Sequence, residues 1–195
     1  MASSISKQIT GLTLVTLMAG TCSALAQDLA WVQEARSVAG AVPPKLLQVL
    51  SDQIAQGGLA SAVTVCNEKA PQMAKTASEQ TGWAIRRVSL KNRNPKAVPD
   101  AWERETLEEF DRRAAAGEDI SKLEKFATAH VDGRPTYRYM KALPTQQLCL
   151  SCHGSSEAIP ADVADKLHAL YPNDKATGYA MGQIRGAMTI RKPVP

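Results

Sequence analysis

The chain has 195 residues, a formal net charge of +4, and 44% hydrophobic residues of which few are aromatic. This length suits one domain with a substantial hydrophobic core and is short for two domains. The positive charge is too mild and too evenly spread along the chain to indicate a nucleic-acid-binding protein.

The N-terminus has the pattern of a secretory signal peptide, residues 1–26. One positive charge, Lys7, precedes an apolar run at residues 12–19, and the small residues that follow predict cleavage before Gln27. The apolar run is too short for a permanent membrane anchor. We therefore expect residues 27–195 to form a single exported domain without a stable anchor, periplasmic in a bacterium.

Cleavage would leave an odd number of cysteines. Of the four in the sequence, Cys66, Cys149 and Cys152 remain in the mature chain. In an oxidising compartment most thiols are paired, so the third cysteine needs an explanation. Cys66, far from the other two, is that residue.

The first part of the mature chain predicts a series of helices. Apolar residues recur at helical spacing from Asp28, an N-cap residue, to Pro43-Pro44, where we expect a break. A second helix should end at Gly57-Gly58. Residues 59–69 continue as a helix that Pro71 should interrupt, and Pro71 can then open the next helix, which runs to about Gln80.

Strand patterns begin after Gly82. Strands are predicted at residues 83–90, 125–131, 134–143 and 182–192, with a turn at Asp132-Gly133 between the second and third. Helices are predicted after the N-cap Asp100 and at residues 161–170. Helices followed by strands with inserted helices indicate an α+β domain with one small antiparallel sheet.

Residues 149–153 read Cys-x-x-Cys-His, the motif for covalent haem attachment. Cys149 and Cys152 lie one helical turn apart, as two thioether bonds to a haem require, and His153 follows directly as the proximal iron ligand. The export signal fits the compartment in which such proteins mature. We therefore predict haem c with its iron, one per chain.

Three other readings of the two cysteines remain open. A redox dithiol usually lies in a βαβ unit, which does not precede Cys149. A zinc site would combine the three cysteines with His130 or His168, but it lacks a second closely spaced ligand pair. A structural disulfide between Cys149 and Cys152 would leave His153 without a purpose.

The sequence leaves open which residue binds the other side of the iron. The candidates are a histidine, a methionine or the third thiol, namely His130, His168, Met73, Met140, Met181, Met188 and Cys66. An unpaired thiol is a liability in an oxidising compartment unless a metal holds it as thiolate. Cys66 is therefore the strongest candidate, although a free cysteine is also commonly a small buried hydrophobe.

Five segments resemble, in the same order, a family of exported c-type haem domains with a Per-Arnt-Sim (PAS)-like fold, largely catalogued as a domain of unknown function. They are AVTVCNEKAP (62–71), IRRVSLKNRNPKAVPDAWE (85–103), YRYMKAL (137–143), CLSCHG (149–154) and YPNDKATGYAMGQIRGAMTI (171–190). The resemblance implies a five-stranded antiparallel sheet and an iron held by His153 and Cys66. Ala97-Val98 departs from the Asn-Ala pair expected in relatives, which puts a polar role of that loop in doubt.

A basic cluster follows the first strand and is a candidate for holding the haem propionates. It comprises Arg86, Arg87, Lys91, Arg93 and Asn94, of which Arg93 is the residue we select. A solvated charged edge of the sheet would have the same composition. The choice between these two roles needs the structure.

Two functions fit the predicted site. A thiolate opposite imidazole favours ferric iron and can leave on reduction, which predicts a redox or gas-responsive sensor that binds CO or NO and signals to a partner protein. The alternative is a low-potential electron carrier with a redox partner. An enzyme would need a placed acid-base group, for which His130 and His168 are the only candidates that we find.

Overall fold

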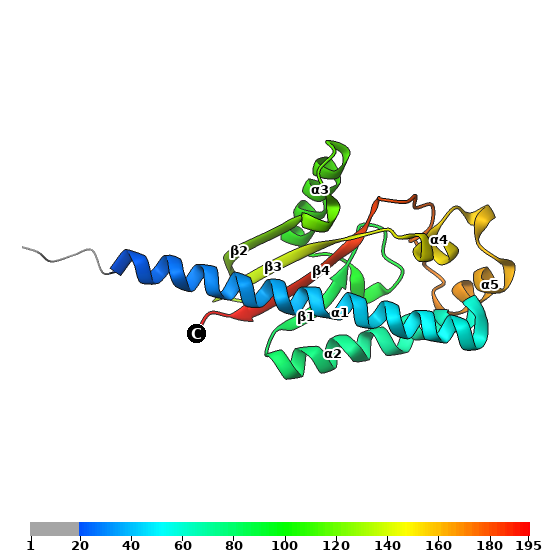
Figure 1. Cartoon of the computed structure of the whole chain (residues 1–195), viewed down its shortest axis with the longest axis horizontal. Helices are drawn as coiled ribbons and strands as arrows, with labels where there is room; N and C mark the ends of the chain where they lie inside the picture. Colours follow the sequence, from blue (N-terminus) through cyan, green and yellow to red (C-terminus); the bar gives the residue numbers. More distant parts are fainter. Residues whose placement is uncertain (1–19) are drawn as a thin grey trace, which may run out of the picture.

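The computed structural model describes residues 20–195, with side chains from Ala30 onward. A long helical hairpin covers one face of an antiparallel sheet, and a shorter helix covers the other face (Figure 1). The predicted signal peptide lies mostly outside the described residues. No helix within residues 20–195 combines the length and the apolar composition needed to cross a membrane.

The hairpin consists of α1 (Gly20–Thr64), a π-helical turn (Val65–Lys69) and α2 (Ala70–Thr81). Gly58 interrupts α1 with φ 75° and ψ 177°, a conformation that glycine adopts without steric cost. The chain turns back there, so that the return arm lies beside the first arm (Figure 1). The helix end predicted at Gly57-Gly58 is confirmed by the non-helical conformation of Gly58.

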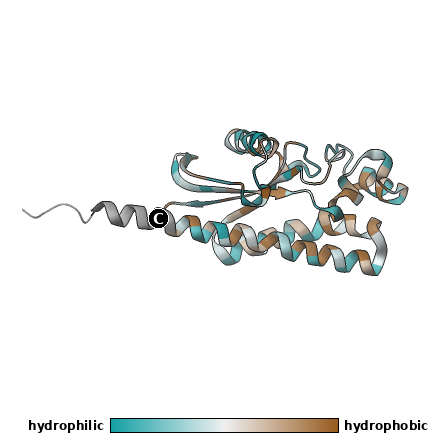
Figure 2. Cartoon of the chain, turned by 45° about the horizontal axis from the view of Figure 1, so that its top comes forward, coloured by the Kyte–Doolittle hydropathy of each residue, from teal (hydrophilic) through white to brown (hydrophobic). Residues whose placement is uncertain are grey.

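The break predicted at Pro43-Pro44 is wrong, because α1 continues through both prolines. A proline inside a helix removes a hydrogen bond and costs about 3 kcal/mol. Burial of the preceding turns offsets this cost, since Ala35 and Ala39 are fully buried against the sheet. Hydrophobic residues recur along both arms of the hairpin (Figure 2).

Pro71 has a milder effect than predicted. The return arm widens into the π-helical turn, in which the Ala70 amide donates to the carbonyl of Val65, and α2 then begins with Pro71 in its first turn. Because Pro71 lacks an amide hydrogen, widening the turn keeps the helix continuous where a regular turn would clash. Cys66 lies in this turn.

The sheet has four strands in the described part of the chain, in the order β1-β4-β3-β2, and all neighbours are antiparallel. The strands are β1 (Ala84–Val88), β2 (Glu124–Val131), β3 (Arg134–Pro144) and β4 (Ile184–Pro193). The turn predicted at Asp132-Gly133 is confirmed, with positive φ at both residues.

The resemblance implies five strands, and this expectation is wrong for the described part of the chain, which has four. Residues 174–179, which precede β4, use their backbone for other partners: the amides of Gly178 and Tyr179 donate to the carbonyls of Gly154 and His153. A segment whose amides are taken in this way cannot extend the sheet.

Each face of the sheet has its own hydrophobic core. The face toward α1 buries Trp31, Val32, Ala35 and Ala39 against Trp83, Ile85, Tyr139, Met188 and Ile190. The other face packs against α3 (Ala101–Ala115), whose Leu107 and Phe110 contact Val88, Leu123, Met140 and Ala187. Tyr137 and Tyr139 both belong to the first core, as their alternate spacing predicts.

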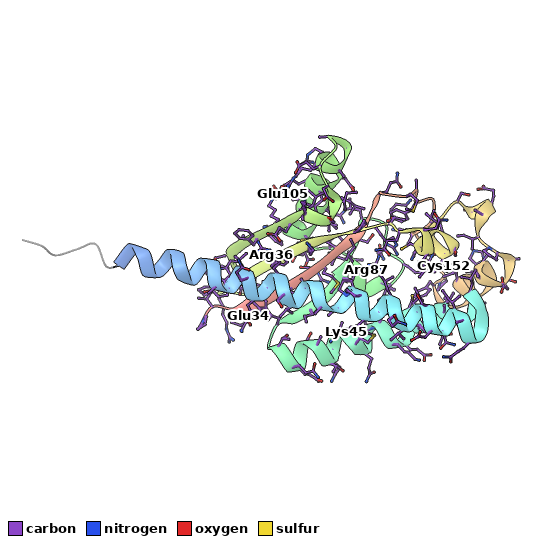
Figure 3. All side chains as sticks on the ribbon, in the orientation of Figure 1. Glu34, Arg36, Lys45, Arg87, Glu105 and Cys152 are labelled. Atoms are coloured by element: carbon purple, nitrogen blue, oxygen red, sulfur yellow. The ribbon has the colours of Figure 1, made fainter. Side chains whose placement is uncertain are left out.

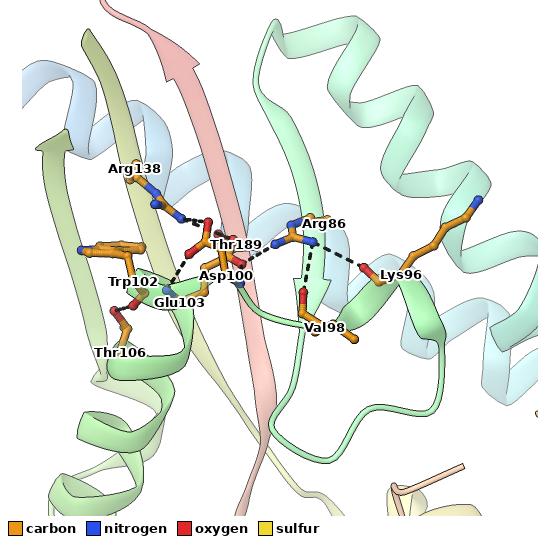
Figure 4. Close-up of polar contacts among 9 residues, drawn as sticks. All are labelled: Arg86, Lys96, Val98, Asp100, Trp102, Glu103, Thr106, Arg138 and Thr189. Atoms are coloured by element: carbon orange, nitrogen blue, oxygen red, sulfur yellow. Dashed lines mark hydrogen bonds and ion pairs between the residues drawn. The ribbon is translucent and has the colours of Figure 1, made fainter. Parts of the chain in front are cut away.

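A buried polar network fixes the N-terminus of α3 to the sheet (Figure 4). Asp100 caps the helix, and the Glu103 carboxylate accepts hydrogen bonds from the Asp100 amide and, at 2.9 Å, from the Thr189 hydroxyl. Arg86 and Arg138 form ion pairs with the same carboxylate. Every oxygen of Glu103 thus has a donor although the residue is only 3% exposed.

Two helices lie beyond one end of the sheet (Figure 1). They are α4 (Gln147–His153), which follows β3, and α5 (Ala161–Leu170), which matches the predicted helix at these residues. Val163, Leu167 and Tyr171 bury Val63 of the return arm, and Cys152 packs against this cluster. The motif helix therefore rests against the part of the hairpin that carries Cys66.

Candidate functional site

The motif residues lie on α4, a helix of two turns. Cys149 and Cys152 are free, half-buried thiols one turn apart, and the Cys149 sulfur accepts from the Gln146 amide at 3.4 Å. The helix ends at Gly154, whose backbone lies close to the preceding turn. A Cβ at this position would lie 2.6 Å from the carbonyl oxygen of Leu150. Only glycine fits at this position without displacing the backbone that presents His153.

The segment before β4 holds the end of α4. The Tyr179 amide donates to the His153 carbonyl at 2.9 Å, and His153 Nδ1 lies 2.7 Å from the carbonyl oxygen of Ala176. A carbonyl oxygen only accepts, so Nδ1 carries the hydrogen and Nε2 keeps its lone pair. This is the tautomer in which an imidazole binds a metal through Nε2.

Arg93 supports the same arrangement. Its guanidinium donates to the Cys152 carbonyl at 2.6 Å and forms an ion pair with Asp174 at 2.9 Å. Asp174 in turn accepts from the Ala176 amide at 2.8 Å. Arg93 therefore holds α4 and the segment around Ala176 together, and its charge already has a carboxylate partner.

Cys66 approaches this site from the hairpin. It is half-buried and free, and its thiol interacts electrostatically with Cys149 and Cys152 and with the arginines Arg87, Arg93 and Arg185. Burial raises the pKa of the Cys66 thiol, while the neighbouring arginines oppose that rise. Without a bound cation the sulfur is therefore a neutral thiol at neutral pH.

Arg185 on β4 is the site residue that sequence reasoning missed. It is 5% exposed, and its Nη2 lies 3.4 Å from His153 Nε2. Its Nη1 donates to Ser89 Oγ at 3.3 Å, whereas its Nε has no hydrogen-bond partner. The available signal was a lone charge within the apolar strand segment GQIRGAMTI.

The guanidinium groups affect one another and the imidazole. Burial, together with Arg87 and Arg93, lowers the pKa of Arg185 to about 9. Burial of the ring and the charge of Arg185 likewise lower the pKa of His153 well below 6.5. His153 is therefore neutral and able to bind a metal at neutral pH.

The predicted basic cluster divides into residues with and without acidic partners. Arg86 pairs with Glu103, Arg93 pairs with Asp174, and Lys91 donates to the Thr177 carbonyl. Asn94 caps a short turn by accepting from the Lys96 amide. Within residues 30–195, Arg87 makes no hydrogen bond or ion pair. It lies on β1 (Figure 3).

The other candidates for the second axial ligand lie elsewhere. His130 and His168 are exposed, on β2 and α5. Met140 and Met188 are buried in the two cores of the sheet, Met181 is 55% exposed, and Met73 lines a groove between α1 and α2. In the described chain no three His, Cys, Asp or Glu side chains lie close enough to hold a metal on their own.

The donor set fits a haem. It offers one imidazole with a free Nε2, two thiols one helical turn apart, a third thiol from a separate element, and two guanidinium groups, of Arg87 and Arg185, without acidic partners. A haem brings an iron for the imidazole, two vinyl groups for the thiols and two carboxylates for the cations. Cys152 on α4 marks the site in Figure 3.

Comparison with known proteins gives a consistent result. A family model described as Tll0287-like matches residues 11–193. The crystal structure of the cyanobacterial heme-protein Tll0287 is similar to this chain with a TM-score of 0.61 and 22% identity, over 90% of this chain and 98% of that chain. No curated protein matches. At this identity the structural likeness confirms the predicted α+β, PAS-like fold.

Proposed function

We propose, from the premise that the chain belongs to the Tll0287-like family, that it is an exported protein with one covalently bound haem c. Cys149 and Cys152 would carry the haem, and His153 and Cys66 would be its axial ligands. The periplasm is the proposed location in a bacterium, after cleavage before Gln27.

The observation that carries this proposal is the hydrogen bond from His153 Nδ1 to the Ala176 carbonyl, 2.7 Å long. It fixes the imidazole in the metal-binding tautomer directly beside two free thiols at the spacing that haem attachment needs. Arg93 and Asp174 hold the accepting carbonyl in place. A structural disulfide between the two cysteines would leave such a histidine without a role.

When bound, the haem iron supplies a one-electron ferric/ferrous couple. Cys66 would stabilise the ferric side as thiolate, and its buried position favours the neutral thiol once the positive charge at the iron decreases. Protonation would release the sulfur and leave a position for CO or NO. This ligand exchange is the proposed basis of redox or gas sensing.

The position of Cys66 favours a sensor. The thiol lies in the π-helical turn of the hairpin, whereas His153 lies on α4, so the two ligands belong to elements that can move separately. A displacement of Cys66 would act directly on the return arm, which packs against α1 along a shared groove. A partner protein that contacts α1 would sense this displacement.

One observation favours the alternative, a low-potential electron carrier. Cys149 and Cys152 are only partly buried, so a macrocycle attached to them would have an edge near solvent. Met181, 55% exposed, follows Tyr179 closely in sequence and offers an apolar contact beside the site for a redox partner.

The attachment is tested by expressing the full chain with a cytochrome c maturation system. We expect a haem-stained band on denaturing gels for the wild type, and none for the Cys149→Ala/Cys152→Ala variant. The mass should correspond to the chain from Gln27 plus one haem. A wild-type protein that carries no haem after maturation would contradict the proposal.

Sensor and carrier differ in ligand binding by the reduced protein. A sensor should bind CO after reduction, and the reduced Cys66→Ala variant should bind it without the delay caused by thiolate release. A carrier should bind no CO and should show fast electron self-exchange. Measuring both quantities on the same sample separates the two functions.

A further inference from the structure

The buried arginines of this protein differ in their partners. Three are buried in the described part of the chain: Arg93, Arg138 and Arg185. Arg93 pairs with Asp174, and Arg138 pairs with Asp100 and Glu103. Arg185 has no carboxylate partner. A buried cation without an acid is costly, so its retention needs a reason.

The contacts of Arg185 point to His153. One amino group of its guanidinium lies 3.4 Å from Nε2, and the guanidinium also lies over the Tyr179 ring, 5.1 Å from its centroid. A guanidinium only donates, so Nε2 accepts, in agreement with Nδ1 donating to Ala176 on the other side of the ring. Arg185 therefore provides a positive partner for the same lone pair that an iron would take.

Binding of a metal at Nε2 would remove this acceptor. Arg185 would then have two donors without partners, Nη2 and the already unpaired Nε, in a buried position. Neighbouring donors of one guanidinium match a single carboxylate in bidentate geometry. Among residues 30–195 no acidic side chain contacts them, so the carboxylate must come from the ligand.

We infer that Arg185 has two successive partners: it orients His153 through Nε2 before haem binds, and it then pairs with a carboxylate of the haem. This inference rests on the proposed function and assigns a positioning and ligand-selecting role within it. Arg87, which also lacks an acidic partner, provides a second cation for the second propionate. The site therefore selects a porphyrin with two free carboxylates.

The second partner is tested with the full chain prepared without haem, titrated with ferric protoporphyrin IX and with its dimethyl ester, whose propionates are uncharged. The wild type should bind the free acid at least about tenfold more tightly than the ester. Arg185→Met should lose most of this preference. Arg185→Lys should retain part of it, because lysine keeps the positive charge but lacks the two parallel donors of the guanidinium. Arg191→Gln, an exposed arginine of the same strand, should behave as wild type.

The first partner is tested in the same haem-free proteins by nitrogen NMR of labelled histidine. Arg185→Met should shift the Nε2 resonance of His153 and leave Nδ1 in place, because only the Nε2 hydrogen bond is lost. Thermal unfolding checks that each variant is folded. If Arg185→Met does not fold, Arg185→Lys replaces it in this measurement.

The outcomes separate the two claims. Three results would overturn the inference while haem binding stands. The wild type could bind acid and ester equally, both Arg185 variants could keep the wild-type preference for the acid, or the Nε2 resonance of His153 could stay unchanged in Arg185→Met. Failure of the wild type to bind either porphyrin would overturn this inference, and absence of haem after maturation would overturn the proposed function with it.

Discussion

Two polar clusters in this protein, one around Glu103 at the N-terminus of α3 and one around His153 on α4, differ in how completely their groups are paired. Around Glu103, each buried oxygen has a donor, and Arg86 and Arg138 have carboxylates (Figure 4). Around His153, Arg185 has no acidic partner among the described side chains, and its Nε has no hydrogen-bond partner there either. A satisfied buried network serves stability, whereas an incomplete one indicates a ligand that completes it.

The largest effect that would sharpen this comparison is expected at His153. In the matured protein, His153→Ala should abolish the low-spin absorption and resonance spectra, because the iron loses its proximal ligand. Covalent attachment through the two thiols should persist on denaturing gels at reduced yield. His168→Ala, which removes an exposed histidine on α5, should leave the spectra unchanged.

Changes in the cluster around Glu103 should lower the stability of the protein instead. Glu103→Gln leaves Arg86 and Arg138 with a weaker acceptor in a buried position, and we expect a loss of about 3 kcal/mol in the free energy of unfolding. Denaturant unfolding measures this loss, with the exposed Glu105→Gln as the matched control. A variant as stable as wild type would show that the network is not structural.

A smaller loss is expected at Gly154. An alanine Cβ would lie 2.6 Å from the Leu150 carbonyl, so the end of α4 must shift, at a cost of about 1–3 kcal/mol. The shift should also broaden the spectra of the bound haem. Gly40→Ala in α1 is the control, since its Cβ meets nothing within 4 Å, and it should stabilise the helix slightly.

The smallest effect is the pH dependence of the haem-free chain. The pKa of His153 in the folded state is well below 6.5. Below pH 6.5 His153 therefore binds a proton in the unfolded chain but not in the folded chain. The contribution of His153 to stability is thus present above pH 6.5 and lost as the pH falls. The difference in Tm between wild type and His153→Gln should decrease on acidification, and a constant difference would contradict this.

Local patterns predicted much of the fold. The cap at Asp100, the turn at Asp132-Gly133 and the helix end at Gly57-Gly58 each depend on the conformational preferences of one or two residues, so the sequence alone suffices. The continuous helix through Pro43 was not predictable in this way. It depends on burial against a sheet whose strands come much later in the chain.

The site, like the fold, was predictable from local sequence only in part. The motif at residues 149–153 is contiguous and could be recognised, but the Ala176 carbonyl, Asp174 and Arg185 reach it only through the folding of β4 beside α4. Their roles arise from backbone and guanidinium geometry, which leave no spacing pattern. Arg93 was selected as a propionate ligand, and that role stays a prediction beside its observed pairing with Asp174.

The central claim is that His153 and Cys66 bind the same iron from two separate elements. Paramagnetic resonance of the ferric matured protein tests it most directly, with wild type compared with Cys66→Ser. We predict a low-spin thiolate signal in the wild type, its loss in the variant, and a higher reduction potential once the anionic sulfur is gone. An unchanged low-spin signal in Cys66→Ser would contradict the claim.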